Sequence, residues 1–204
     1  MPSQISSEKE TPTIRTPRRE RGKARVAALL AAGAAVFSER GYDSATMTEV
    51  AAKAGASIGS LYQFFPTKPL LAEALHAELL TALVARLDGV RGEVAGLGAA
   101  AAMERVFAVL GDFLADHPAF GALADRRDID KQRKKEARAL LRGRLAAMLT
   151  AAAPPVPKAR AEAAAVIILH LIRAAVVLLN DPDETGIREA ALTEMRGMLT
   201  AYFA

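Results

Sequence analysis

The chain has 204 residues, of which 51% are apolar and 25% charged, with no cysteine or tryptophan and a net charge of +4. This length allows one large domain or two small ones. The absence of cysteine excludes disulfides, thiolate chemistry and cysteine-ligated zinc, and it fits a reducing cytosol. Frequent alanine and leucine, with few β-branched stretches, favour helix over strand. The composition therefore predicts an all-α protein.

The excess positive charge lies at the N-terminus. Residues 1–25 contain seven basic and three acidic residues, whereas the remainder contains twenty of each. Residues 1–20 are rich in serine, threonine, proline and charge without periodicity, so we expect a disordered basic arm. Such an arm suits the neutralisation of DNA phosphates. It also fits a tail that only keeps the protein soluble.

The first predicted helix runs from about residue 21 to residue 40. Its apolar residues recur at helical spacing and define one face, and Gly41 then provides a C-terminal stop. A basic stretch before an apolar run also resembles a secretion signal. No small-residue cleavage site follows this run, so a helix is the better interpretation. The residues of the predicted face are Val26, Leu29, Leu30, Gly33 and Phe37.

Residues 46–65 predict two short helices joined by a tight turn. Thr46 and Glu49 have the spacing of a capping box, which starts the first of them. Gly55 supplies the left-handed turn that ends it, and Ser57 is a natural N-cap for a second helix that ends near residue 64. This second helix is small and polar on one side and carries an aromatic anchor on the other, as entry into the major groove of DNA requires. The segment is therefore a candidate helix-turn-helix.

A fourth helix is expected to begin near Thr67 and to continue to about residue 88. Gly89 and the glycines that follow it predict a loose region. Helical periodicity then predicts five further helices, so the whole chain is expected to contain about nine. No membrane span is predicted. The most apolar segment, residues 163–179, is short for a membrane-spanning helix and includes His170 and Arg173. The five later helices are expected at 99–115, 119–125, 129–151, 158–180 and 184–203.

A longer pattern at fixed spacing surrounds the candidate helix-turn-helix. It consists of Gly41-Tyr42, Ala45-Thr46, Val50-Ala51, Ala54-Gly55-Ala56-Ser57, Gly59-Ser60-Leu61-Tyr62, Phe64-Phe65 and Lys68. This pattern resembles the DNA-binding domain of the TetR/AcrR family of bacterial transcription regulators. The resemblance implies a DNA-binding domain at residues 21–68. It also implies a helical, sequence-variable domain for ligand binding and dimerisation at residues 69–204.

Three positions depart from the family's usual pattern. Ala56 stands where valine is usual, and Pro69 stands where an acidic residue is common. Ile58 replaces a residue that is usually polar. None of these changes removes a feature that a helix-turn-helix needs. Ile58 nevertheless prevents any base preference of relatives from being transferred to this chain.

The residues expected to contact DNA lie in and around the second short helix. The resemblance implies that the Tyr62 hydroxyl donates to a backbone phosphate, and Lys68 is expected to share a phosphate with the N-terminus of the fourth helix. Gly59 allows close approach, while Ile58 and Gln63 suit a thymine methyl and an adenine. Each residue also has a plainer role as cap, core or solvated surface. The expected contact residues are Thr46, Thr48, Ser57, Ile58, Gly59, Ser60, Tyr62, Gln63 and Lys68.

Specific binding by such a small unit needs two copies, spaced so that both recognition helices reach major grooves about 34 Å apart. Residues 166–179 are apolar on all sides, which predicts a fully buried helix. Pairing this helix and the last helix with their copies gives a four-helix interface, and one buried helix in a monomer is the alternative. The expected interface residues are Val166, Leu169, Arg173, Val177, Ala191, Met195 and Leu199.

The resemblance also implies a small-molecule site among the later helices. Methionine, phenylalanine and histidine residues there are candidates, although core packing is the commoner explanation of such residues. Basic clusters at 126–127 and 133–135 suit either an acidic effector or a solvated helix face. The candidate ligand-binding residues are Met103, Phe107, Phe113, His117, Phe120, Met148 and His170.

Together these features favour a repressor that binds a near-palindromic operator as a homodimer and leaves it when an effector binds. The alternative is a helical structural or interaction protein with a non-functional helix-turn-helix. An enzyme is not expected, because the chain has three histidines and lacks HExxH, P-loop and GxSxG motifs. The expected partners are double-stranded DNA, a second copy and an unknown small molecule in the bacterial cytoplasm, with no membrane, metal or cofactor.

Overall fold

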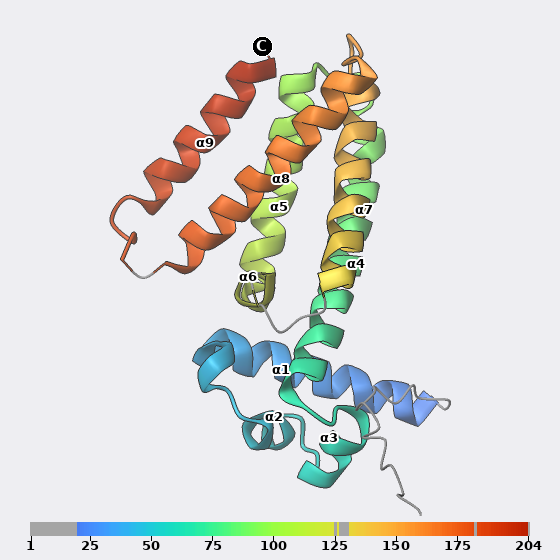
Figure 1. Ribbon diagram of the computed structural model, residues 1–204, viewed down its shortest axis with the longest axis vertical. Helices are drawn as coiled ribbons and strands as arrows, with labels where there is room; N and C mark the ends of the chain where they lie inside the picture. The colour runs from blue at the N-terminus through green and yellow to red at the C-terminus, as the bar shows by residue number, and fades with distance from the viewer. Residues whose placement is uncertain (1–19, 125, 127–130, 182, 204) are drawn as a thin grey trace, which may run out of the picture. The chain divides into compact units, whose positions relative to one another are not determined.

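The computed structural model describes residues 20–124, 126, 131–181 and 183–203. These residues form nine α-helices and no strand, which confirms the all-α prediction (Figure 1). The expected basic arm lies outside the described residues except for its last position. The chain divides into two compact units within the fourth helix, between Ala74 and Leu75 rather than after residue 68.

The first unit contains α1 (Glu20–Ser44), α2 (Met47–Lys53), α3 (Ile58–Phe64) and the first residues of α4 (Lys68–Val94). α1 is interrupted at Gly41, whose φ of 72° favours glycine. This is the position at which the sequence predicted the end of the helix. The predicted apolar face of α1 is buried apart from the half-buried Val26, and its buried members are Leu29, Leu30, Gly33 and Phe37.

The turn between α2 and α3 is built around Gly55, which has a φ of 58°. The Gly55 N–H donates to the Ala52 carbonyl at 3.1 Å, and the Ala56 N–H donates to the Ala51 carbonyl at 2.9 Å. These two hydrogen bonds form a Schellman motif and satisfy carbonyls at the end of α2. The backbone itself therefore fixes the direction in which the chain leaves α2.

α4 is longer than predicted and ends at Val94 rather than near residue 88. The sequence predicted a loose region from Gly89, because glycine in a helix interior costs about 1 kcal/mol relative to alanine. Val90 and Val94 are buried. Burial of a valine side chain contributes roughly 1.5–3 kcal/mol, so the two valines outweigh the glycine penalty.

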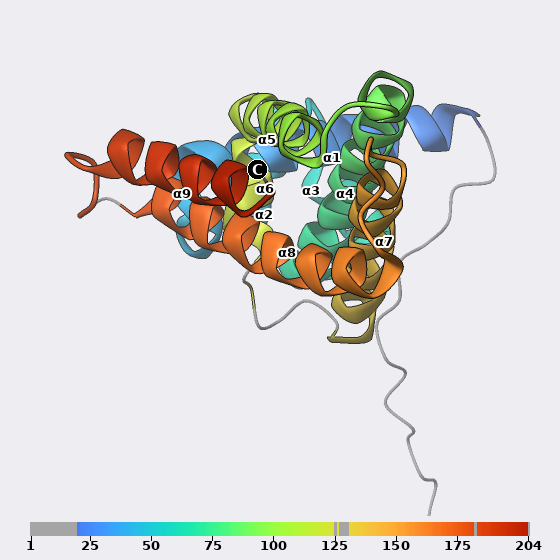
Figure 2. The same ribbon diagram turned by 90° about the horizontal axis from the view of Figure 1, so that it is seen from above.

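The second unit contains the rest of α4 together with α5 (Ala99–Asp116), α6 (Pro118–Ala124), α7 (Lys131–Thr150), α8 (Lys158–Asn180) and α9 (Arg188–Phe203). α8 packs against α7 and α6, and α9 packs against α5 and α8. Within this unit α4 and α7 lie on one side, α9 lies on the other, and α8 runs between them (Figure 2). Three salt bridges join α4 to α5 and α7, namely Arg86–Asp116 at 2.7 Å, Glu93–Arg105 at 2.9 Å and Asp88–Arg144 at 3.1 Å.

In the single chain α8 is buried on one side only, and the predicted burial on all sides would need a second copy. Val176 is buried, whereas Val166, Ile167 and Val177 are exposed in the single chain. The neighbouring helices of one chain cover one side of α8 and leave the other open. The segment Lys158–Leu179 is also long and apolar enough to cross a membrane, although no span was predicted there from the sequence. One such helix is weak evidence for a membrane, because helices buried in cores and interfaces share this composition.

Two glycines of the first unit are expected to respond to alanine in opposite directions. Gly55→Ala places a Cβ at a positive φ and should destabilise the unit by about 1–2 kcal/mol. Gly59→Ala lies within α3, where an added Cβ meets no atom within 4 Å, and should stabilise it by about 0.5–1 kcal/mol. Urea unfolding followed by circular dichroism measures both changes. Equal changes would contradict the assigned turn.

Candidate DNA-binding and ligand sites

α3 has one buried face and one exposed face. Leu61 and the C-cap residue Phe65 are fully buried, so they fix the helix against the first unit. Tyr62 is 47% exposed, and Ile58 and Gln63 are exposed as well. The outward surface of α3 therefore presents a phenol hydroxyl, an aliphatic group and an amide. These are groups that can meet a phosphate, a thymine methyl and a base edge.

The N-terminal part of α3 carries small residues. Ser57 is the N-cap, and its Oγ accepts a hydrogen bond from the Ser60 N–H at 3.1 Å. Ser60 is half-buried, whereas Gly59 is exposed and a Cβ there would meet only open space. A bare backbone at this position allows another molecule to approach closely.

The predicted capping box at the start of α2 is present. The Thr46 N–H and hydroxyl donate to Glu49 Oε2 at 2.9 and 2.8 Å, and the Glu49 N–H donates to Thr46 Oγ1 at 3.2 Å. The hydrogen bonds from the Thr46 side chain and backbone, followed by the charge of Arg40, hold the pKa of Glu49 below its usual value. The Thr46 hydroxyl is thus engaged within the helix, whereas Thr48 is exposed.

Lys68 has a position different from the one expected for a phosphate ligand. Its Nζ donates to the carbonyls of Tyr42, Asp43 and Ala45 at 2.9, 3.1 and 2.9 Å. The ammonium also lies 4.7 Å from the centre of the Tyr42 ring, which adds a cation–π contact. An ammonium has three hydrogens, so all of them are used within the first unit. Lys68 therefore ties the start of α4 to the connection between α1 and α2.

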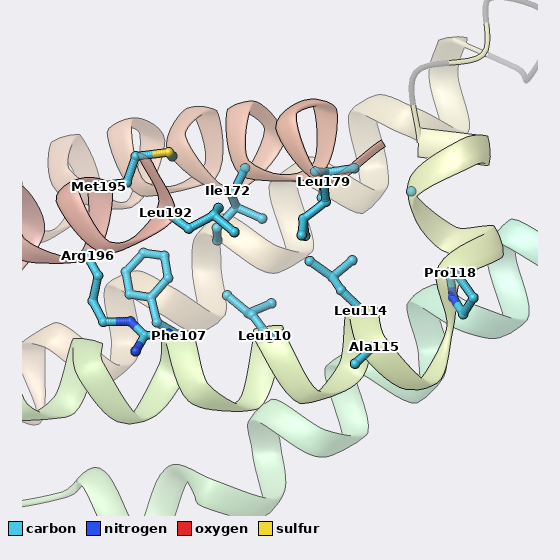
Figure 3. Close-up of a pocket in the computed structure, with 14 residues that line it drawn as sticks. Phe107, Leu110, Leu114, Ala115, Pro118, Ile172, Leu179, Leu192, Met195 and Arg196 are labelled. Atoms are coloured by element: carbon cyan, nitrogen blue, oxygen red, sulfur yellow. The ribbon is translucent and has the colours of Figure 1, made fainter. Parts of the chain in front are cut away.

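The second unit contains an apolar cavity of about 350 Å³ between α5, α6, α8 and α9. Leucine, isoleucine, phenylalanine and methionine account for seven of its 14 lining residues, and Arg196 is the one charged residue among the described residues that line it. Arg196 and Phe107 lie at one end of the cavity, and Ala115 and Pro118 lie at the other (Figure 3). The cavity is therefore an apolar channel with a guanidinium at one end.

A second hollow, which we call the basic pocket, has a volume of about 240 Å³ and lies among α4, α6, α7 and α8. Ile172 and Val176 line both this pocket and the apolar cavity. The residues that define the basic pocket are His76, Leu80, Phe120, Lys134, Ala137, Arg138, Leu141, Arg142, Val166, Leu169, His170, Ile172, Arg173 and Val176.

The structure separates the predicted ligand-binding residues into two groups. Phe107 lines the apolar cavity, and Phe120 and His170 line the basic pocket. The other four line neither hollow. His117 is half-buried with its ring centre 4.5 Å from that of Phe113. The remaining residues are core side chains with almost no exposed surface, and these are Met103, Phe113 and Met148.

The predicted interface residues are also divided. Val166, Arg173 and Val177 are exposed on α8, and Leu169, Ala191 and Met195 are half-buried. Leu199 is only 4% exposed because it packs inside its own chain, so it has little surface for a second copy. Two large exposed apolar residues of α9 were not predicted as interface residues, and they are Met198 and Tyr202.

Family models match both units. The model for bacterial regulatory proteins of the tetR family matches residues 29–75, and the model for the tetracyclin repressor-like C-terminal domain matches residues 100–203. The chain belongs to the TetR family. Its members are DNA-binding transcription regulators with an N-terminal helix-turn-helix and a C-terminal ligand-binding domain. No curated protein has a matching sequence.

Solved structures of transcriptional regulators share the fold of this chain. FadR of Bacillus subtilis, solved with stearoyl-CoA, has a TM-score of 0.67 at 17% identity, covering 85% of this chain and 97% of FadR. A TetR-family regulator from Streptomyces coelicolor has a TM-score of 0.64 at 23% identity, covering 87% and 96%. One from Legionella pneumophila has a TM-score of 0.67 at 16% identity, covering 87% and 96%. At these identities the similarity shows the fold.

Replacement of Lys68 tests its role as a structural tie in this TetR-family chain. Lys68→Met removes three charge-assisted hydrogen bonds and is expected to destabilise the first unit by about 2–3 kcal/mol. Lys53→Met is the matched control, because the exposed Lys53–Glu39 ion pair contributes about 0–1 kcal/mol. Urea unfolding distinguishes the two variants. Similar midpoints would contradict the tie.

Proposed function

We propose that the protein is a ligand-released repressor that binds a palindromic operator as a homodimer. The observation that carries the proposal is the exposed surface of α3, which presents Tyr62, Ile58 and Gln63 beside the bare backbone of Gly59. Entry of a short helix into the major groove needs this combination of polar ends and close approach. Tyr62 is assigned to a phosphate, and Ile58 and Gln63 are assigned to base edges.

The remaining residues predicted to contact DNA are proposed to differ in whether they reach the DNA or position other residues. The exposed Thr48 is proposed to reach the DNA backbone. Thr46, Ser57 and Lys68 are proposed to act mainly by positioning, because their polar groups take part in hydrogen bonds within the first unit. Ser60 is half-buried beside Ser57 and offers a small donor for a nearby phosphate or base.

A second copy is proposed to pack on the open faces of α8 and α9. Val166, Arg173 and Val177 recur at helical spacing on α8, and Met198 and Tyr202 add exposed apolar surface on α9. Exposed apolar side chains of this kind favour an interface. Burial against a second copy also gives α8 the full cover that its composition predicts. Two copies then supply the two recognition helices that an operator needs.

An effector is proposed to bind within the second unit and to weaken operator binding. FadR was solved with stearoyl-CoA, which supports a small-molecule ligand for this chain without naming it. Both the apolar cavity and the basic pocket have volumes within or near the usual range for small-molecule sites. α4 belongs to both units, so a ligand that contacts α4 has a continuous helix through which it can act on the first unit.

The Tyr62 hydroxyl is expected to matter for DNA and not for folding. Tyr62→Phe should weaken binding to the best duplex from an in vitro selection by about 5–10-fold, because one phosphate hydrogen bond contributes about 1 kcal/mol. Thr81→Val is the control, since it also removes one hydroxyl from an exposed side chain but lies on α4 outside the first unit. Gel shifts at fixed salt measure both. A non-functional helix-turn-helix predicts only weak, non-specific binding and no difference between the variants.

An acidic side chain on α8 is expected to prevent dimerisation. Val177 is 48% exposed, so Val177→Glu should leave the fold intact while burying a charge at the proposed interface. Leu140→Glu is the control, because Leu140 is 45% exposed on α7. Analytical ultracentrifugation should show a monomer, with operator affinity reduced at least 10-fold, for the Val177 variant alone. A dimer that tolerates Val177→Glu would contradict the assigned face.

A further inference from the structure

The basic pocket concentrates positive charge in a hollow of the second unit. Four of its lining residues are Lys134, Arg138, Arg142 and Arg173, and no aspartate or glutamate is found among the described residues that line it. The three on α7 are spaced four residues apart, so they form a row on one side of the helix. Like charges at this spacing destabilise a helix, so the row is unfavourable unless an anion is present.

The arginines of this row are not neutralised by the fold. Neither Arg138 nor Arg142 forms a salt bridge within the described residues. Arg144, on the same helix, pairs with Asp88 at 3.1 Å. α7 therefore has one arginine that is paired within the chain, whereas Arg138 and Arg142 have no carboxylate partner in the part of the chain that the structure describes.

The rest of the pocket is apolar. Apart from the four basic residues and two histidines, all of its lining residues are aliphatic or aromatic. Its volume of about 240 Å³ has room for roughly eight non-hydrogen atoms at about 30 Å³ each. A hydrated inorganic ion would make no apolar contacts with this wall, and a hydrocarbon would form no ion pair with the basic side chains. The lining matches a molecule that has both parts.

His76 links the apolar and basic parts of the pocket. Its ring stacks on Phe120 with the ring centres 5.5 Å apart. Burial, followed by the charge of Lys134, lowers the pKa of His76. The imidazole is therefore neutral at pH 7. It lies close enough to Lys134 for the ammonium charge to affect its pKa. The Lys134 ammonium is held in place by donating to the Arg126 carbonyl.

We propose that the basic pocket binds a small organic acid as the effector of the proposed repressor, on which this inference rests. The ligand has about six to ten non-hydrogen atoms in all, and its apolar part packs on Leu141, Leu169 and Phe120. Its acidic group lies among the basic side chains, where Arg138 and Arg142 pair with it.

Octanoate and octan-1-ol test the required charge, because they share the same hydrocarbon chain. Isothermal titration calorimetry on the full chain without DNA should show octanoate binding at least 10-fold more tightly than octan-1-ol. Octanoate affinity should also fall as salt is raised, because the pocket is partly open to solvent. Equal affinities for the two ligands, or no octanoate binding at millimolar concentration, would overturn the proposal.

Paired variants locate the site. Arg138→Gln combined with Arg142→Gln should weaken octanoate binding at least 10-fold. Lys135→Gln combined with Arg91→Gln removes the same net charge from exposed residues outside the pocket and should change the affinity less than 2-fold. Arg196→Gln should likewise have little effect. A loss caused by Arg196→Gln alone would assign the ligand to the apolar cavity and overturn the proposal.

Histidine NMR gives a readout that protein stability does not affect. A bound carboxylate offsets the charge of Lys134, so octanoate should raise the pKa of His76. An unchanged His76 titration at saturating octanoate would overturn the proposal. The operator assay separates this inference from the proposed function. A dimer that binds DNA but ignores octanoate disproves only the pocket, whereas a protein that binds octanoate but no DNA disproves the repressor.

Discussion

The burial of Leu61 and Phe65 is the constraint on which the DNA-binding unit depends. These two side chains fix the rotation of α3, so Tyr62 and Ile58 point outward as a consequence of packing. The left-handed Gly55 sets the direction of the chain before α3. Lys68 then closes the unit by binding carbonyls at the end of α1. The recognition surface is thus presented by a small rigid frame, which limits the conformational entropy lost on binding.

α8 imposes a comparable constraint on the second unit. Its composition is too apolar for one side to remain in water, yet a single chain covers only the other side. The second copy proposed above would supply this cover, and membership of the TetR family favours that proposal over a lipid bilayer. Arg173 and His170 lie on the exposed side, and their polarity also suits a protein interface better than the interior of a membrane.

Local signals in the sequence predicted the first unit well. A capping box, a C-terminal glycine and an N-cap serine act through neighbours within a few residues, so Thr46, Gly55 and Ser57 could be read directly. The position of the Lys68 side chain could not be predicted in this way, because its three acceptors lie 23 to 26 residues away along the sequence. Helical periodicity identifies buried residues but does not distinguish a core residue from one that lines a cavity. Met103 and Met148, which are core residues, were therefore predicted as ligand-binding residues together with Phe107, which lines the apolar cavity.

Ile172 and Val176 form a partition between the apolar cavity and the basic pocket. The two hollows share this wall, so a displacement of the two side chains toward one hollow would take space from it and add space to the other. If a bound ligand displaced the wall, its effect on the affinity of the other hollow would be reciprocal. Val177 is exposed on the same helix, so a rotation of α8 would also change the surface proposed to meet a second copy.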